Sequence, residues 1–239
     1  MPLATHPSGS RTLLILGLAL LGLAPLGGCA VASLAGAMQQ SAEYQKRIEV
    51  LPKYDDLADQ RVAVLVNVDM YTQYEHPMLE ETVRQGVSAR LQKFVPESRV
   101  ISPLDIKRWQ YQTAQWDSMP YGEMVESLGV DRVILIDIYE YRLNPPGNSW
   151  EWEGVAVASV GIIEADSLVP DMFVDEFEVY AAFPQFERLT RSEASANVIE
   201  YGLQAEFIKR ISWLFYTHLE PKYPDKYQPE LDRNRGEDI

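Results

Sequence analysis

The feature that most limits the fold is the return of apolar strand-like runs along the middle of the chain. Residues 61–66 (RVAVLV) form a continuous run of β-branched and aliphatic residues, and residues 132–139 (RVILIDIY) are the most strand-like run in the chain. Such runs are typical of strands covered on both faces, as in parallel sheets. Parallel neighbours need a crossover connection, which a helix usually supplies. We therefore expect an α/β fold.

The segments between these runs have the spacing of crossover helices. Residues 77–95 begin with a proline and place apolar side chains at intervals of three and four, as an amphipathic helix does. The apolar positions are Leu79, Val83, Val87, Leu91 and Phe94. Residues 99–102 predict a short strand, and residues 121–128 predict a second helix that ends at Gly129. The expected order to this point is β-α-β-α-β.

The pattern changes after a Pro-Pro-Gly turn in residues 144–148. Residues 152–163 and 172–183 predict two more strands, which would form an antiparallel meander with the strand before them. Residues 190–193 (TRSE) have the form of a capping box, so we expect a helix from there to about His218. Its expected apolar stripe consists of Ala194, Val198, Tyr201, Ala205, Ile208 and Phe215, widened by Phe207, Ile211 and Leu214.

The expected fold is thus a mixed sheet in β-α-β-α-β-β-β-α order, with a long C-terminal helix packed on the sheet. Of the 239 residues, 46% are hydrophobic, which is ordinary for a globular chain. We expect a single α/β domain in residues 61–219. Residues 29–60 would form a tether before it, and residues 220–239 would form a charged, solvated tail.

The amino terminus has the form of an export signal. Arg11 precedes an apolar run, residues 13–24, that is shorter than the roughly 20 residues a membrane-spanning helix needs. Leu26-Gly27-Gly28-Cys29 follows. Small residues give a slender backbone that a peptidase cleft accepts, and the Cys29 thiol is a nucleophile. This string resembles the lipobox of bacterial lipoproteins, which implies cleavage of residues 1–28 and acylation of Cys29, for example with palmitate.

Two or three acyl chains would hold the chain stably on a membrane. Ala30, rather than aspartate, follows the cysteine, which resembles lipoproteins passed on to the outer membrane. The alternative is an uncleaved signal anchor with a buried, inert cysteine. Cys29 is the only cysteine, so no intramolecular disulfide can form. The net charge of -14 argues against nucleic acid or anionic lipid headgroups as partners.

One local motif suggests a family. Leu128-Gly129-Val130-Asp131 joins a helix to an apolar strand, behind the lipobox and the expected element order. This plan resembles the periplasmic domains of the TolB amino-terminal, CsgG, LpoB and PelC group, and small lipoproteins without an assigned function. The resemblance implies a non-enzymatic recognition or assembly module in the periplasm, which binds an envelope protein or self-associates. The chain lacks the length for the CsgG pore hairpins or the TolB propeller.

The sequence offers little for catalysis. His76 and His218 fall near expected helix ends, where we interpret them as capping or solvated groups, and we assign no catalytic, cofactor-binding or metal residue and no cofactor. A carboxylate-dependent envelope hydrolase is the alternative function. Asp137 would be its best residue, because burial in an apolar strand raises a carboxyl pKa. Otherwise Asp137 lies near the strand end or pairs with Arg132 or Arg142.

Four tryptophans are candidates for partner contact. Trp109 and Trp116 lie in one connection with several tyrosines, and Trp150 and Trp152 follow the Pro-Pro-Gly turn. Tryptophan is common at the centre of protein interfaces, but it also fills small cores under long loops. Full burial of Trp109 and Trp116 would remove that segment as a contact surface. A purely structural spacer would need neither an aromatic surface nor a pair of acids.

Overall fold

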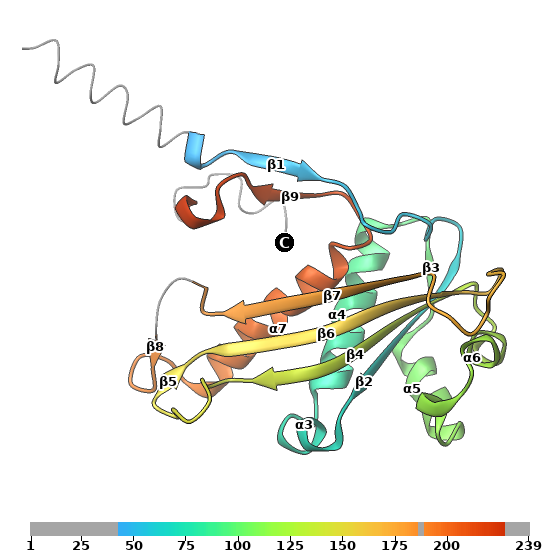
Figure 1. Cartoon of the computed structure of the whole chain (residues 1–239), viewed down its shortest axis with the longest axis horizontal. Coiled ribbons are helices and arrows are strands. Elements are labelled where there is room, and N and C mark those ends of the chain that lie inside the picture. The colour runs from blue at the N-terminus through green and yellow to red at the C-terminus, as the bar shows by residue number, and fades with distance from the viewer. Residues whose placement is uncertain (1–42, 186–188, 228–239) are drawn as a thin grey trace, which may run out of the picture. The chain divides into compact units, whose positions relative to one another are not determined.

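The largest sheet in the described part of the chain is a five-stranded mixed sheet (Figure 1). The computed structural model describes residues 43–185 and 189–227. The sheet order is β3-β2-β4-β6-β7. Its strands are β2 (Arg61–Val68), β3 (Arg99–Val100), β4 (Arg132–Arg142), β6 (Gly154–Glu164) and β7 (Asp175–Phe183). β2 is parallel to β3 and β4, whereas β4, β6 and β7 are antiparallel neighbours. The predicted parallel part and the predicted meander are both confirmed.

Helices cover the two sheet faces unequally. α4 (Leu79–Phe94) and α7 (Ala196–Ser212) pack on one face, while α5 (Pro103–Gln112) and α6 (Tyr121–Leu128) lie over one end of the other (Figure 1). α6 ends at Gly129, whose φ of 62° lies in the left-handed region that glycine adopts readily. Shorter elements are α3 (Met70–Glu75), the 3-10 helix η1 (Trp116–Ser118) and the paired strands β5 (Glu151–Trp152) and β8 (Leu189–Thr190).

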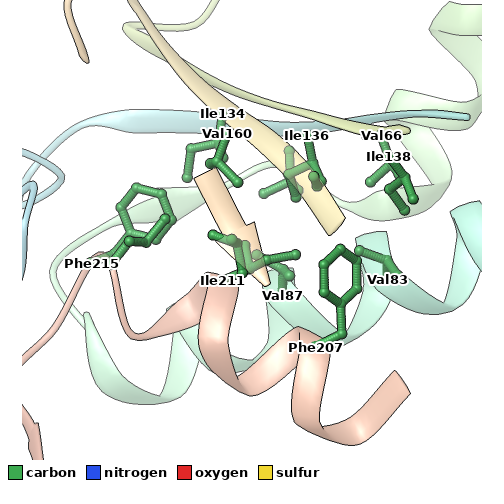
Figure 2. Close-up of a cluster of buried hydrophobic side chains, with 14 of the residues drawn as sticks. Val66, Val83, Val87, Ile134, Ile136, Ile138, Val160, Phe207, Ile211 and Phe215 are labelled. Atoms are coloured by element: carbon green, nitrogen blue, oxygen red, sulfur yellow. The ribbon is translucent and has the colours of Figure 1, made fainter. Parts of the chain in front are cut away.

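The main core lies between the sheet and the pair α4 and α7. Alternate residues of each strand point into it, and the helices supply the facing side chains (Figure 2). The contributing residues include Val66, Ile134, Ile136, Ile138 and Val160 from the sheet and Val83, Val87, Phe207 and Ile211 from the helices. A smaller core lies beneath α5 and α6. The long C-terminal helix therefore packs on the sheet as predicted.

The chain divides into two compact units, of which residues 51–218 are one. We call this the central unit. In the other unit, β1 (Arg47–Val50) pairs with β9 (His218–Pro221), and the 3-10 helix η2 (Pro224–Lys226) follows. Glu43 accepts hydrogen bonds from Lys222 and Lys46, which lower the pKa of its carboxyl to about 2. Part of the expected solvated tail is therefore in regular structure.

The central unit begins earlier than expected. Tyr54 and Leu57, in the segment expected to be a tether, are buried in the main core. The Tyr54 ring meets Phe215 edge-on at 6.3 Å, and the backbone N–H groups of residues 53 and 54 both donate to the carbonyl of Leu214. These contacts join segments far apart in sequence, so no local pattern indicated them.

The C-terminal helix differs from the prediction at its start and in its buried stripe. It begins at Ala196, because the hydroxyl and N–H of Thr190 both donate to Glu193 and close a separate turn. The expected stripe residues Val198 and Tyr201 are 54% and 72% exposed. The expected Phe207, Ile211, Leu214 and Phe215 are buried, and Ile199 and Leu203 lie in the buried stripe in place of Val198 and Tyr201. Apolar side chains occur on more than one side of this helix, so the spacing alone allowed two stripes.

Candidate functional site

Part of the second sheet face has no covering helix within the described residues. α5 and α6 bury its beginning, at Ala63, Leu65, Val133 and Ile163. Beyond them the strands present mainly polar and tyrosine side chains around Val157 of β6, and we call this part the open face. The open face consists of Asn67, Asp137, Tyr139, Ser159, Glu176, Glu178 and Tyr180. Tyr139 and Tyr180 are 53% and 52% exposed.

Neutral donors hold the carboxylates of the open face. Asn67 donates to Asp137 at 3.0 Å, and Ser159 donates to Glu176 at 2.6 Å. The Tyr139 hydroxyl donates to Glu178 at 2.8 Å, and this bond raises the pKa of Tyr139. In the part of the chain that the structure describes, no ion pair joins these three carboxylates to a basic side chain. Their charge is therefore oriented but not neutralised.

A hollow of about 180 Å³ lies where the open face meets η1 and α6. Three carboxylates line it, from Asp117, Asp137 and Glu176. Its aromatic lining comes from Trp116, Tyr121 and Phe173. None of the lining residues is basic.

The aromatic wall of the hollow depends on a glycine. Tyr121 and Phe173 stack with their ring centroids 4.7 Å apart and an interplanar angle of 23°. The Phe173 ring lies so close to Gly161 of β6 that a side chain there would meet it. Burial raises the pKa of Tyr121, and the negative charges of Glu176 and Asp137 raise it further. The hollow therefore combines a flat apolar wall with a negative potential.

The expected surroundings of Asp137 were wrong. It is exposed, because its position in β4 points to the open face and away from the core. It also pairs with neither Arg132 nor Arg142, since Arg142 contacts Glu140 and Glu153. The sequence did place Asp137 correctly within a strand, and the alternation of β4 could have indicated its exposed side.

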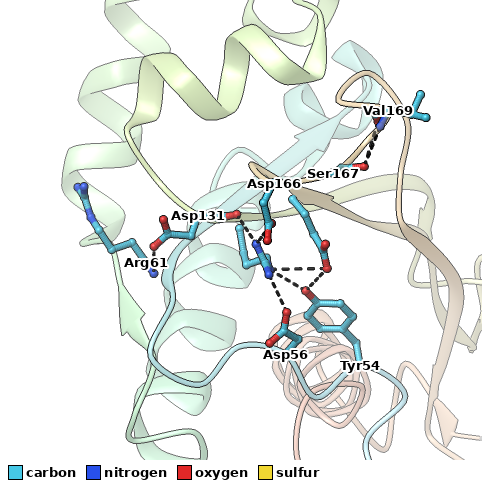
Figure 3. Close-up of polar contacts among 9 residues, drawn as sticks. Tyr54, Asp56, Arg61, Asp131, Asp166, Ser167 and Val169 are labelled. Atoms are coloured by element: carbon cyan, nitrogen blue, oxygen red, sulfur yellow. Dashed lines mark hydrogen bonds and ion pairs between the residues drawn. The ribbon is translucent and has the colours of Figure 1, made fainter.

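Arg132 instead organises an ionic cluster at the start of β4, and Figure 3 shows Tyr54, Asp56 and Asp166 of this cluster. Its side chain is 4% exposed and contacts Asp56 at 2.6 Å and Asp166 at 2.7 Å. It also donates to the Tyr54 hydroxyl, which in turn donates to Glu164 at 2.7 Å. Burial raises the pKa of Tyr54, and the bond to Glu164 adds to this. The cluster ties two connecting segments to the sheet, which is a structural role.

The four tryptophans have different environments. Trp109 and Trp116 are half-buried against the smaller core, with ring centroids 6.3 Å apart, and Trp109 donates to Ser127 at 2.9 Å. Trp150 is 77% exposed, whereas Trp152 is 6% exposed and donates to the Ala194 carbonyl. Only Trp116 lines the hollow. Trp152 is therefore a packing residue, while the other three keep accessible surface.

The histidines make packing contacts. His76 lies 2.9 Å from Glu200 and meets the Tyr141 ring edge-on, so it joins the start of α4 to α7. His218 lies beyond α7, which ends at Ser212, and stacks on Trp213 with 4.3 Å between centroids. Its predicted place in the last helical turn was wrong. Among the described residues, no group of three or more acidic, histidine or cysteine side chains could hold a metal ion.

The predicted lipidation segment, Leu26, Gly27, Gly28 and Cys29, lies outside the described residues, as do residues 228–239 of the expected tail. The described helices include none that is long and apolar enough to cross a membrane.

No protein-family model and no curated protein sequence matches the chain. Its structure is similar to the PelC dodecamer subunit from Paraburkholderia phytofirmans, with 12% identity and a TM-score of 0.42 over 72% of this chain and 97% of that one. It is also similar to lipoprotein GNA1162 from Neisseria meningitidis, with 11% identity and a TM-score of 0.40 over 61% and 93% of the two chains. A third similar structure is protein CT253 from Chlamydia trachomatis, with 13% identity and a TM-score of 0.39 over 65% of this chain and 96% of that one. These likenesses assign no family.

Proposed function

We propose that this chain is a lipid-anchored protein of the bacterial envelope, whose central unit recognises another envelope protein without catalysing a reaction. The observation that carries the proposal is the unequal coverage of the sheet. α4 and α7 bury one face, while the open face presents Tyr139 and Tyr180 between carboxylates. Half-exposed tyrosines beside polar groups are well suited to a protein interface, because they offer apolar area with little entropy to lose.

The anchor part of the proposal rests on the lipobox-like string that ends at Cys29 and on the apolar run before it. Acyl chains on Cys29 would hold the protein at a membrane whose anionic headgroups repel a chain of charge -14. Ala30 favours the periplasmic face of the outer membrane.

A partner of different sequence fits the open face better than a second copy. Two copies placed face to face would bring Asp137, Glu176 and Glu178 against the same carboxylates. Like charges brought together in an interface cost several kcal/mol, about enough to prevent association. Self-association would therefore use another surface of the protein.

The hydrolase alternative has one observation in its favour, since Asp137 and Glu176 line the same hollow. Paired carboxylates are what glycoside hydrolysis requires. However, both side chains are exposed, and the hollow of about 180 Å³ is smaller than the roughly 300–1,000 Å³ of ordinary ligand pockets. The geometry therefore favours binding over hydrolysis.

Photo-crosslinking in intact envelopes tests the recognition function. A crosslinking amino acid replaces Tyr180 on the open face or, as a control, Gln92 on the exposed side of α4. We expect an adduct with an envelope protein from position 180 and none, or a different one, from position 92. Equal adducts from both positions, or adducts only with soluble cytoplasmic enzymes, would contradict the proposal. Cleavage of an envelope polymer that Asp137→Asn and Glu176→Gln both abolish would support the hydrolase instead.

A further inference from the structure

Two carboxylates of the hollow, Asp137 and Glu176, have neutral hydrogen-bond donors as partners, whereas many other carboxylates of the central unit form ion pairs. Asp166 pairs with Arg132, Glu81 pairs with Arg84, and Glu206 pairs with Lys209. Asp137 and Glu176, by contrast, accept hydrogen bonds from an amide and a hydroxyl. Neutral donors fix the direction of a carboxylate without cancelling its charge. A cationic group arriving from outside would therefore find two aligned, uncompensated acceptors.

The aromatic side chains of the hollow indicate which kind of cationic group would bind there. Trp116 and the stacked pair of Tyr121 and Phe173 line the same hollow as the acids. The negative face of an aromatic ring attracts cations, and the planar, weakly hydrated guanidinium of arginine also stacks on it. The guanidinium can donate to carboxylates in its own plane at the same time. An arginine side chain can therefore stack on the aromatic rings of the hollow and donate hydrogen bonds to its carboxylates.

The spacing of the acids suits an extended segment better than a small ion. Asp137 lies on β4 and Glu176 on β7, with β6 between them and a register offset of two residues, so their backbones are about 12 Å apart at the usual strand spacing and rise. Glu178 continues the acidic surface along β7, opposite Ser159. Basic side chains carried on one peptide could meet several of these carboxylates together.

We propose that the open face binds a basic segment of its protein partner and that an arginine of this segment occupies the hollow beside Trp116. The inference rests on the proposed recognition function and specifies the chemistry of the partner. Charge complementarity selects this occupant, because the lining carries three carboxylates and no basic group. An acidic segment or a second copy of the open face would meet only like charges.

Peptide binding to the full-length protein in a non-ionic detergent tests the inference. The probes are the peptide acetyl-Gly-Arg-Gly-Arg-Gly-amide and its citrulline counterpart, which keeps the shape of arginine but lacks the charge. Tryptophan fluorescence and calorimetry follow the titration. We expect the arginine peptide to bind at least roughly fivefold more tightly than the citrulline peptide at low salt, and the difference to shrink with added salt. Equal binding of the two peptides would overturn the inference.

Matched variants separate the hollow from the overall negative charge. Glu176→Gln and Asp137→Asn each remove one charge from the hollow, and Glu97→Gln removes one from an exposed position after α4. We expect each of the first two to weaken arginine-peptide binding roughly threefold to tenfold and the third to leave it unchanged. Circular dichroism checks that all three variants are folded. An equal loss in Glu97→Gln would show attraction by bulk charge and would overturn the assignment to the hollow.

The crosslinking result distinguishes the two ideas. If an envelope partner crosslinks at position 180 but the arginine peptide fails to bind, the arginine assignment is wrong and the recognition function stands. If neither experiment succeeds, the recognition function itself fails.

Discussion

Two arginine side chains are buried in the described part of this fold, Arg84 and Arg132, and Arg132 joins segments that are far apart in the sequence. It is 4% exposed and contacts Asp56, Asp166 and Tyr54 at hydrogen-bonding distances. Burial opposes its charge, but its acidic neighbours raise the pKa of the guanidinium above its ordinary value. Asp56 and Asp166 are 58% and 74% exposed, so water can solvate them without Arg132, whereas the buried Tyr54 hydroxyl loses a donor.

We predict that Arg132→Ala lowers the free energy of unfolding by about 1–3 kcal/mol, because it removes a buried side chain and a donor to the Tyr54 hydroxyl. Chemical denaturation of the folded variant measures this loss. Arg108→Ala is the control, because Arg108 pairs with Asp105 on the surface, where both side chains are more than half exposed. It should cost at most about 1 kcal/mol. Equal losses in the two variants would show that the contacts of Arg132 add no more stability than a surface ion pair.

The carboxyl group of Glu206 makes the free energy of unfolding depend on pH. Burial opposes the charge of its carboxylate, but Lys209 and Arg210 on the next turn outweigh this effect and lower the pKa of Glu206. A carboxyl whose pKa is lower when folded contributes stability above its unfolded pKa, and this contribution is lost as the pH falls through the folded pKa. We predict that Glu206→Gln lowers the unfolding free energy at pH 7 and makes its decline below about pH 4 shallower. Denaturation across this pH range measures both; an unchanged acid decline would contradict the prediction.

Gly161 controls the shape of the hollow. A methyl group added there meets the ring of Phe173, which stacks on Tyr121. We predict that Gly161→Ala costs about 1–3 kcal/mol and displaces the Phe173 ring. Denaturation measures the cost, and ring-proton chemical shifts of Tyr121 report the lost stacking. Unchanged shifts and stability would mean that the aromatic wall does not depend on this glycine.

Among the elements, α7 decides how well the sheet is covered, and its buried stripe can be tested directly. Phe207 is fully buried between the sheet and α4, whereas Val198 is 54% exposed on the other side. We predict that Phe207→Ala lowers the unfolding free energy by about 3–5 kcal/mol, while Val198→Ala changes it by less than about 0.5 kcal/mol. Thermal or urea unfolding measures both. A larger loss from Val198→Ala would restore the stripe expected from the sequence.

Elements with a strong local signal were predictable. β2 and β4 appeared as strongly strand-like apolar runs, and α6 ended at the glycine that was expected to stop it. The start of α7 was not predictable, because Thr190 donates two hydrogen bonds to Glu193 within a separate turn instead of capping the helix. The same side-chain types serve both structures, so the choice between them depends on tertiary packing.

The hollow was harder to predict than the fold. It combines Trp116 from η1, Phe173 from a connection and Glu176 from β7 with Asp137 from β4. The alternation within β4 and β7 could have shown that Asp137, Glu176 and Tyr180 share a face with few apolar side chains. It could not have shown that Trp116 and Phe173 come together there, since neither lies in a periodic element of the sheet.

At the scale of the whole molecule, the net negative charge predicts different salt dependence for the two proposed interactions, which are binding of a basic partner and anchoring in a membrane. A net charge of -14 repels anionic lipid headgroups, so electrostatic adsorption cannot hold the protein at a membrane. The same charge attracts a basic partner to the open face, and that attraction weakens in salt. Membrane attachment through acyl chains on Cys29 should instead be insensitive to salt.

We therefore predict that the wild-type protein stays in the membrane fraction after a wash with about 1 M salt, where the Debye length is about 3 Å, and is released only by detergent. Cys29→Ser should incorporate no labelled palmitate, because serine lacks the thiol that accepts the diacylglyceryl group. Fractionation with and without salt, together with the label, measures both. Palmitate incorporation into Cys29→Ser, or release of the wild type by salt alone, would contradict lipid anchoring at this residue. Membrane retention of an unlabelled Cys29→Ser variant would instead indicate the uncleaved signal anchor, since that segment holds the bilayer through its apolar run and needs no thiol.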